Sequence, residues 1–181
     1  MASPQLQTER LVLRQWKDDD LWPFVELNAD PEVMEYFPAP VTAEQSAEMM
    51  GVQQSLLDAG KPALFAAEIW ATSTFIGFIG LSVPRFEAPF TPCVEIGWRL
   101  ARSAWGHGYA TEGADAVLKY AFVSLGLPEV VSFTAEGNKR SRAVMERLRM
   151  SHDPAEDFDH PSVPSGDPLQ RHVLYRKSRP R

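Results

Sequence analysis

Cysteine is almost absent from this chain: Cys93 is the single one among 181 residues. A lone thiol cannot form an intrachain disulfide, and a chain of this length buries roughly 70% of its unfolded surface, enough to fold without cross-links. Low cysteine usage also favours a reducing compartment, so we expect a cytoplasmic protein. Because no histidine stands at a fixed spacing from Cys93, we interpret it as a small buried thiol rather than a nucleophile.

Long hydrophobic runs are also missing. No stretch approaches the ~18 consecutive apolar residues that a membrane-spanning helix needs. Residues 1–16 lack the basic start and long apolar core of a signal peptide. The sequence therefore predicts no membrane segment and no secretion signal.

Histidine and net positive charge are scarce too. The formal net charge is −6, which argues against the broad positive field of a general nucleic-acid binder. The four histidines show no metal-ligand spacing, and only Cys93 could add sulfur, so we expect no metal site. They are His107, His152, His160 and His172.

What is present is the patterning of one α/β (α+β) domain over residues 1–181. Alternating or continuous apolar residues predict strands over 11–16, 64–70, 75–83, 93–100, 129–135 and 171–176. Helices are expected from the Asp18–Asp20 run to Leu27, from Thr42 to Ala59, from Ala110 to Leu125 and from Asn138 to Met150, with a loop over 154–168. We expect a mixed, mostly antiparallel sheet of about six or seven strands flanked by helices.

The segment from Trp105 to Thr111, WGHGYAT, lies between a predicted strand and an amphipathic helix. Its two glycines, Gly106 and Gly108, allow a tight turn and the close approach of a ligand. The first turn of a helix offers unpaired N–H groups and a partial positive charge. Together these features indicate a phosphate-binding site, although the same letters could mark a simple glycine turn.

Three phosphate-binding motifs can be compared with this segment. A P-loop ends in Gly-Lys-Ser/Thr, which is missing. A dinucleotide fingerprint would require Gly or Ala in place of Thr111. The third motif is the pyrophosphate loop of acyl-CoA-dependent N-acetyltransferases, Gln/Arg-x-x-Gly-x-Gly/Ala. Residues 105–110 fit it except at the first position, where Trp105 stands in place of Gln or Arg.

Flanking blocks make this similarity specific. The blocks EIGWRL (95–100) and WGHGYATEG (105–113) resemble the GNAT superfamily of N-acetyltransferases, in the branch of bacterial ribosomal-protein N-terminal-amine (Rim-type) enzymes. TERLVLR (8–14) and NKRSRAVMERL (138–148) resemble the same branch, in the same order along the chain.

The resemblance implies acetyl-CoA as co-substrate and a single GNAT-like domain. The pantetheine arm would lie between strands 93–100 and 129–135, and a backbone N–H near Ile96 or Gly97 would polarise the acetyl carbonyl. The implied cofactor-binding residues are Trp98, Leu100, Trp105, Gly106, His107, Gly108, Tyr109, Ala110, Thr111 and Asn138.

The resemblance also suggests catalytic residues. Glu95 is the candidate base that deprotonates the amine, although it could instead form a salt bridge on the sheet surface. Many family members protonate the leaving thiolate with a tyrosine where this chain has Met145. In the branch resembled, a serine matching Ser141 takes that role; it could equally be a first-turn capping residue. A second departure is Arg149, where the family usually has glycine to end the helix.

The implied activity is acetyl transfer from acetyl-CoA to a primary amine, on a protein N-terminus or a small molecule, by direct attack in a ternary complex. The alternative is a non-catalytic acyl-CoA-binding or regulatory domain. Tyr36 and Phe37 are candidates for the acceptor side, and several bases near 139–149 could meet the cofactor's 3′-phosphate. We expect no nucleic-acid or membrane partner, and a monomer or homodimer.

Overall fold

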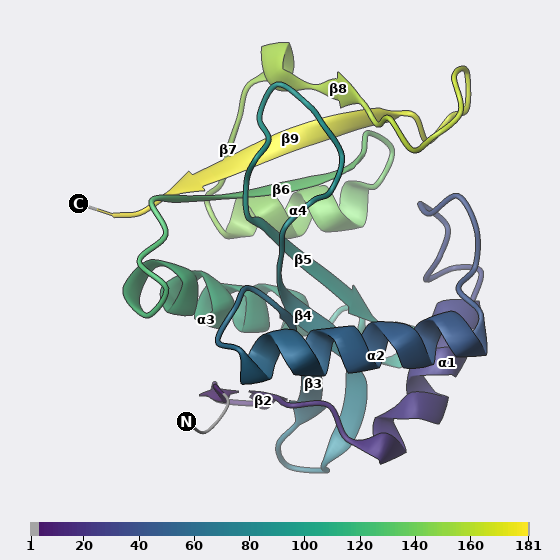
Figure 1. The fold of residues 1–181 in the computed structure, drawn as a ribbon, viewed down its shortest axis with the longest axis vertical. Helices are drawn as coiled ribbons and strands as arrows, with labels where there is room; N and C mark the ends of the chain where they lie inside the picture. The colour runs from purple at the N-terminus through teal and green to yellow at the C-terminus, as the bar shows by residue number, and fades with distance from the viewer. Residues whose placement is uncertain (1–3, 181) are drawn as a thin grey trace.

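The computed structural model describes residues 4–180, and their strands form one nine-stranded sheet (Figure 1). The strand order is β1-β2-β3-β4-β5-β6-β9-β7, with β8 paired to β9. The longer strands are β2 (Leu11–Arg14), β3 (Leu64–Ile69), β4 (Thr74–Ser82), β5 (Glu95–Leu100), β6 (Glu129–Ala135) and β9 (Arg171–Ser178). All neighbouring pairs are antiparallel except β5 and β6, so the predicted mixed, mostly antiparallel sheet is confirmed.

The expected strand number is too low because of three two-residue strands. These are β1 (Leu6–Gln7), β7 (Ser151–His152) and β8 (Phe158–Asp159). The last of them lies in the segment predicted as a loop. Phe158 is buried there against Phe133 of β6 and two phenylalanines of the loop after β4, Phe86 and Phe90. Burial of this ring draws the segment onto the edge of β9.

The helices cover both faces of the sheet. They are α1 (Leu21–Ala29), α2 (Ala43–Asp58), α3 (Tyr109–Val123) and α4 (Lys139–Arg147). Phe24 of α1 packs edge-on against Phe78 of β4. On the opposite face Tyr120 of α3 meets Phe65 of β3. Side chains alternate between the two faces of a strand, so the sheet is a middle layer between α1 and α3.

Helix starts show where local signals were sufficient. Thr42 and Gln45 form the predicted capping box at the start of α2, with reciprocal hydrogen bonds of 3.2 and 2.9 Å. The Asp18–Asp20 run forms a 3₁₀ turn rather than the first turn of α1. Asp20 stands at the predicted N-cap position of α1, but its side chain accepts no hydrogen bond from that helix. Its carboxylate instead accepts two hydrogen bonds from buried Arg14, at 2.7 and 2.8 Å.

Candidate active site

A gap between β5 and β6 forms the centre of the site. The two strands share a single register pair, Glu95 with Val131, whereas β4 pairs with β5 over six positions. Figure 1 shows β5 turning away from β6 beyond this point. Across the opening, the Ser132 hydroxyl donates a hydrogen bond of 2.9 Å to the Ile96 carbonyl. One edge of β5 therefore lacks a partner strand over most of its length.

The alternation of backbone groups determines which residues of β5 face this gap. The carbonyls of Val94 and Ile96 accept hydrogen bonds from the β6 side. The N–H and C=O groups of alternate residues point the same way, so those of Trp98 and Leu100 also face the gap, while those of Gly97 face β4. The Leu100 carbonyl accepts from the indole Nε1 of Trp105 at 2.8 Å. Trp98 keeps both groups for an extended ligand.

The loop after β5 leads into the start of α3. Gly106 and Gly108 have φ values of 77° and 81°, which favour glycine over residues with a Cβ. Gly108 is the N-cap residue and α3 begins at Tyr109, and no side chain of residues 4–180 accepts from the first N–H groups of the helix. These free donors at the positive end of a 15-residue helix suit a phosphate.

Thr111, in the first turn of α3, carries a buried hydroxyl without a hydrogen-bond partner among the described residues. Nearly all buried polar atoms in native proteins are hydrogen-bonded, so an orphan at this position is informative. It lines the same pocket as Gly106 and Gly108. A bound phosphate oxygen would give this hydroxyl the acceptor that it lacks, and the residues present therefore fit a diphosphate.

Glu112 anchors the loop to the N-terminal segment, a relationship that the sequence did not reveal. Its carboxylate accepts from the Thr8 hydroxyl, from the Arg10 N–H at 2.8 Å and from the Arg10 guanidinium at 2.7 Å. These partners hold the pKa of Glu112 below its usual value. The Arg10 guanidinium also lies over the ring of Tyr109, 4.8 Å from its centre. Thr8 and Arg10, which belong to the block TERLVLR (8–14), thus hold the start of α3 and the phosphate loop in place.

Asn138 and Ser141 meet at the start of α4. The Asn138 side chain accepts from the Ser141 N–H at 3.2 Å and donates to the Ser141 hydroxyl at 3.2 Å and to Thr134 at 2.9 Å. Asn138 is therefore the cap of α4, and Ser141 keeps its hydroxyl proton free to donate toward the pocket. Both line the pocket, as does Met145, whose side chain is almost fully buried.

Glu95 lies at the point where β5 and β6 separate. The Ser82 hydroxyl donates to its Oε2 at 3.0 Å, and no ion pair involves Glu95 among residues 4–180. Burial raises its pKa to about 7, against the opposing effect of the Ser82 hydrogen bond. A carboxylate with such a pKa is suited to accept a proton near neutral pH. The neighbouring thiol of Cys93 has a pKa raised to about 11 by burial, so it stays protonated.

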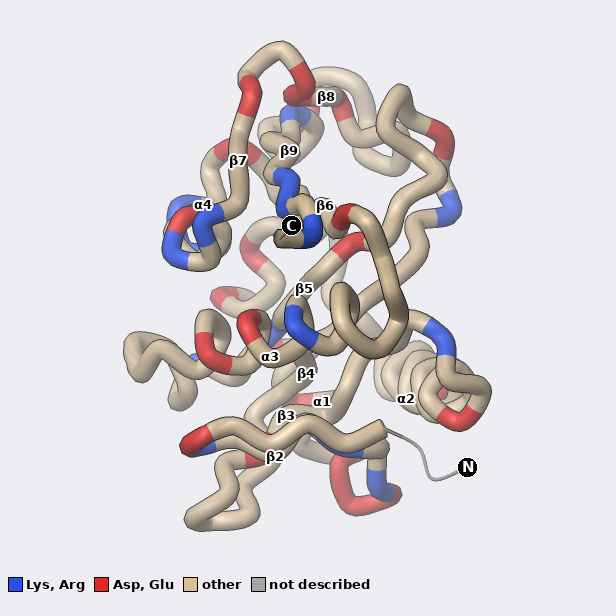
Figure 2. Tube along the Cα trace, turned by 90° about the vertical axis from the view of Figure 1, so that its left-hand side faces the viewer, with Lys and Arg blue, Asp and Glu red and all other residues tan. Residues whose placement is uncertain are grey.

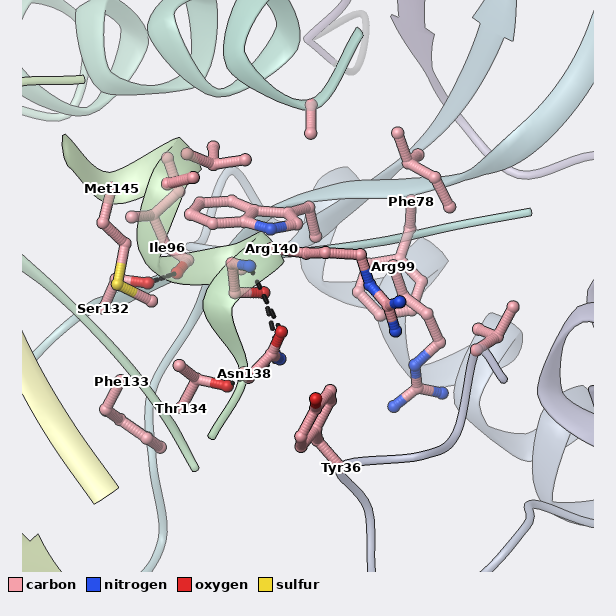
Figure 3. Close-up of a pocket in the computed structure, with 18 of the residues that line it drawn as sticks. Tyr36, Phe78, Ile96, Arg99, Ser132, Phe133, Thr134, Asn138, Arg140 and Met145 are labelled. Carbon is pink, nitrogen blue, oxygen red and sulfur yellow. Dashed lines mark hydrogen bonds between the residues drawn. The ribbon is translucent and has the colours of Figure 1, made fainter. Parts of the chain in front are cut away.

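One pocket of about 1320 Å³ joins these groups. Its lining includes Gly106 of the loop, Trp98 and Glu95 of β5, and Tyr36 and Phe37 of the segment between α1 and α2. Figure 3 shows Tyr36 close to Asn138, and the Cε1 of Tyr36 lies 3.6 Å from the position of a Cβ added at Gly137. Such a volume exceeds the roughly 300–1,000 Å³ common for small-ligand sites, so it has room for a long carrier and an acceptor together.

The remaining sequence-derived candidates divide into two groups. Trp105, Tyr109 and Ala110 line the pocket, and the Trp105 ring lies 4.3 Å below the Arg140 guanidinium. His107 does not line it: the imidazole is exposed and stacks on Tyr109, with ring centres 5.4 Å apart. Within the loop, the backbone and the hydroxyl of Thr111 therefore offer more to a phosphate than the histidine ring does.

The helix α4 brings positive charge to one wall of the pocket. Figure 2 shows Lys and Arg gathered along it. Arg140 pairs with Glu35 at 2.8 Å, and Arg142 donates to the Glu136 carbonyl. Lys139 and Arg147 also line the pocket and have no ion pair among the described residues. They are the bases best placed to meet a further phosphate.

Among residues 4–180, no helix is both long and apolar enough to cross a bilayer. No cluster of three or more His, Cys, Asp or Glu side chains there could hold a metal ion.

The sequence of the chain matches a known protein family. Residues 10–151 match the family model described as an acetyltransferase (GNAT) domain. The chain is 35% identical over 161 residues to the FsC-acetyl coenzyme A-N(2)-transacetylase of Aspergillus fumigatus, a match covering 83% of this chain and 66% of that protein. The chain thus spans just under two thirds of this relative's length.

Solved structures share the fold. An acetyltransferase from Agrobacterium tumefaciens is 28% identical, with a TM-score of 0.76 and coverage of 98% of this chain and 95% of that one. RimL, a ribosomal L7/L12 alpha-N-protein acetyltransferase in complex with coenzyme A, has a TM-score of 0.77 at 14% identity, covering 97% and 98%. At that identity the likeness concerns the fold alone.

The chain therefore belongs to the GNAT family of acetyltransferases, as its motifs suggested. It is an acyltransferase of the N-acetyltransferase type, and its family uses acetyl-CoA.

Proposed function

We propose that this enzyme transfers the acetyl group of acetyl-CoA to a primary amine by direct attack in a ternary complex. The observation that carries the proposal is the single pocket linking the phosphate loop, the unpaired edge of β5 and Glu95. A carrier lying along that edge would bring its thioester beside Glu95. The acceptor would enter from the side of Tyr36 and Phe37.

The binding groups are mainly backbone groups. N–H groups from Gly106 to Thr111, with the Thr111 hydroxyl, would hold the diphosphate, and the Trp98 backbone would pair with the amide-rich arm. Acetyl-CoA supplies the activated acyl group. Because the Gly97 N–H points toward β4, the Trp98 N–H is the better candidate to polarise the acetyl carbonyl.

Glu95 and Ser141 would handle the protons. Glu95, with its pKa near 7, removes a proton from the attacking ammonium so that the nitrogen lone pair can form the new C–N bond. As the C–S bond breaks, the departing thiolate takes the Ser141 proton, and the second proton released by the acylated nitrogen returns through solvent to the Ser141 oxygen. Ser141 is oriented for this by Asn138, whose amide donates to the Ser141 oxygen and leaves the proton available. Met145, at the position of the usual tyrosine, has no proton to give.

The acceptor class follows only by analogy. The branch resembled acts on protein N-terminal amines, and the relative from A. fumigatus is named for acetyl transfer to an N(2) position. Both are primary or substituted amines, and we extend that class to this chain.

Two measurements test the proposal. Calorimetric titration with coenzyme A should show saturable binding that Gly108→Ala weakens, since a Cβ at φ 81° distorts the loop. Gly51→Ala, inside α2 with no atom within 4 Å of the added Cβ, is the matched control. Thiol release from acetyl-CoA is then followed with peptides, polyamines and aminoglycosides. Binding with no release by any amine would indicate the non-catalytic alternative.

Variants then assign the roles. Glu95→Gln should lower kcat/KM for the best amine by about 10²-fold or more while coenzyme A binding is retained. Ser141→Ala should lower kcat with little change in carrier affinity. Wild-type turnover by both variants across the pH range would remove these residues from the mechanism.

A further inference from the structure

Arg99 of β5 is a partly buried arginine without a counter-charge among residues 4–180. Arg14, which is buried more completely, is paired with Asp20 and Glu68 at 2.7 Å each. Arg99 has no carboxylate within 4 Å among residues 4–180. Burial accordingly lowers the pKa of Arg99 to about 10, whereas the partners of Arg14 raise its pKa. A buried charge is normally paired, so an unpaired guanidinium in a pocket wall needs an explanation.

The guanidinium of Arg99 is held in place by neutral groups. Its Nη1 donates to the Asn28 Oδ1 at 2.7 Å, and the Asn28 amide donates to Ser46 at 3.0 Å. Asn28 and Ser46 are both fully buried. Phe37 and Phe78 flank the guanidinium, with ring centres 4.2 and 5.3 Å away. The group is therefore pre-oriented, which lowers the entropic cost of binding a ligand.

One hydrogen-bonding edge of this guanidinium is unused. Nε is buried without a partner, and Nη2 makes no hydrogen bond to the described residues. Stacking on Phe37 covers the flat face, and the donors in the plane of the group at this edge have no acceptor among residues 4–180. The edge formed by Nε and Nη2 presents two parallel N–H donors, and this spacing matches the two oxygens of a carboxylate.

Arg99 lies on the acceptor side of the pocket. It shares one face of β5 with Glu95, four residues away, which corresponds to roughly 13 Å along a strand. Its cross-strand neighbour is Phe78, as Ser82 is that of Glu95. Figure 3 shows Arg99 and Tyr36 directed into the same part of the pocket. Phe78 marks the face of the sheet covered by α1, opposite the face covered by α3 and its phosphate loop. A molecule that reaches from Glu95 toward Arg99 on the α1 face is therefore the acceptor rather than the carrier.

We propose that Arg99 binds a carboxylate of the acceptor, so that the substrate is an amine carrying a carboxylate several bonds from its nitrogen. This inference rests on the proposed function, because the amine is taken to react beside Glu95. The separation along β5 favours an extended amino carboxylate or an acidic peptide over a simple α-amino acid.

The test compares ω-amino carboxylates of increasing chain length with their primary amides, which have the same shape and no charge. In the wild type, one chain length should show a kcat/KM at least about tenfold higher for the carboxylate than for its amide, because charge-assisted bidentate hydrogen bonds are strong. Arg99→Gln should bring this ratio close to one. Arg179→Gln removes one exposed charge distant from the pocket and should leave the ratio unchanged.

A binding arm separates this inference from the proposed function. The N-acetylated carboxylate and its amide are titrated into the coenzyme A-saturated protein, which requires no turnover. Binding of the carboxylate that Arg99→Gln weakens about tenfold, without acetylation of any amine, would retain the carboxylate site and overturn the transfer function. Acetylation of amines with no carboxylate preference at any chain length would retain the function and overturn the site.

Discussion

The hydroxyl of Ser82 donates a hydrogen bond of 3.0 Å to the Oε2 of Glu95, across the register pair that joins these residues on β4 and β5. This bond favours the charged carboxylate, whereas burial favours the neutral acid and is the larger effect. Burial and the Ser82 hydrogen bond together set a pKa of about 7 for Glu95, the candidate base.

Removing the Ser82 hydroxyl should move the pH dependence of the reaction upward. If Glu95 is the base, kcat/KM rises as pH increases through about 7, and Ser82→Ala shifts the midpoint to higher pH. Ser55→Ala, at an exposed hydroxyl on α2, is the control and should leave the midpoint in place. If Ser82→Ala and the wild type had identical pH profiles, the rise of kcat/KM with pH would not come from deprotonation of Glu95.

The same carboxyl should make stability depend on pH. Its folded-state pKa of about 7 lies above the ordinary 4.5, so the folded state binds the proton more tightly. The resulting stabilisation is fully present below pH 4.5 and is lost as pH rises through 7. The free energy of unfolding of the wild type should therefore fall relative to Glu95→Gln between pH 5 and pH 8 in urea titrations. A constant difference between the two proteins would contradict the raised pKa.

The orphan hydroxyl of Thr111 provides a test of the phosphate site. Thr111→Val keeps the shape and removes a buried polar group that lacks a partner, so stability should stay within about 1 kcal/mol of the wild type or increase. Coenzyme A affinity should fall about tenfold by calorimetry. Thr111→Ser restores the hydroxyl and should restore most of the affinity. A Val variant that loses stability and keeps its affinity would assign the hydroxyl a structural role.

The fold could be predicted wherever the pattern was local. Apolar periodicity located β3, β4, β6 and α3 to within two residues, and the Thr42 capping box marked the start of α2. The errors occurred where tertiary contacts determine the structure. The Asp20 carboxylate binds Arg14 instead of the first N–H groups of α1, and β8 forms because Phe158 is buried in a cluster of rings from other segments. Apolar periodicity reports neither a buried ion pair nor a cluster of distant rings.

The sequence predicted the residues of the phosphate loop, but not the contacts that hold the loop in place. The loop at Gly106 to Thr111 followed from its glycines and its place before a helix. The supporting bonds to Glu112 required knowledge of where residues 8–10 lie on the sheet. Arg99 carried a signal that could have been used: a charged residue between Trp98 and Leu100 alternates onto the face of Glu95.

The Glu112 anchor should be measurable in stability. Glu112→Gln weakens the bonds from Thr8 and Arg10, and we expect a loss of about 1–2 kcal/mol in unfolding free energy at pH 7. Because the folded-state pKa of Glu112 lies below 4.5, this advantage is present above pH 4.5 and is lost as pH falls below it. Asp115→Asn, which removes an exposed pair with Lys119, should change stability by less than about 0.5 kcal/mol.

Arg149 ends α4 in a conformation that favours glycine. Its φ is 55°, the left-handed geometry that the family's glycine would adopt more easily. A side chain there costs about 1 kcal/mol, so Arg149→Gly should raise the unfolding free energy by about 0.5–1 kcal/mol after the greater freedom of the unfolded glycine is included. The bonds from Lys177 to the carbonyls of Leu148 and Arg149 remain available in the variant.

Arg149→Ala is the matched control for that gain. It removes the same charge and retains a Cβ, so the left-handed strain persists and no stabilisation should appear in urea titrations. If Ala and Gly stabilise the protein equally, the benefit comes from removing positive charge at the end of a basic helix. If only Gly stabilises it, the cost lies in the backbone of Arg149, and the chain tolerates a strained helix end at this position.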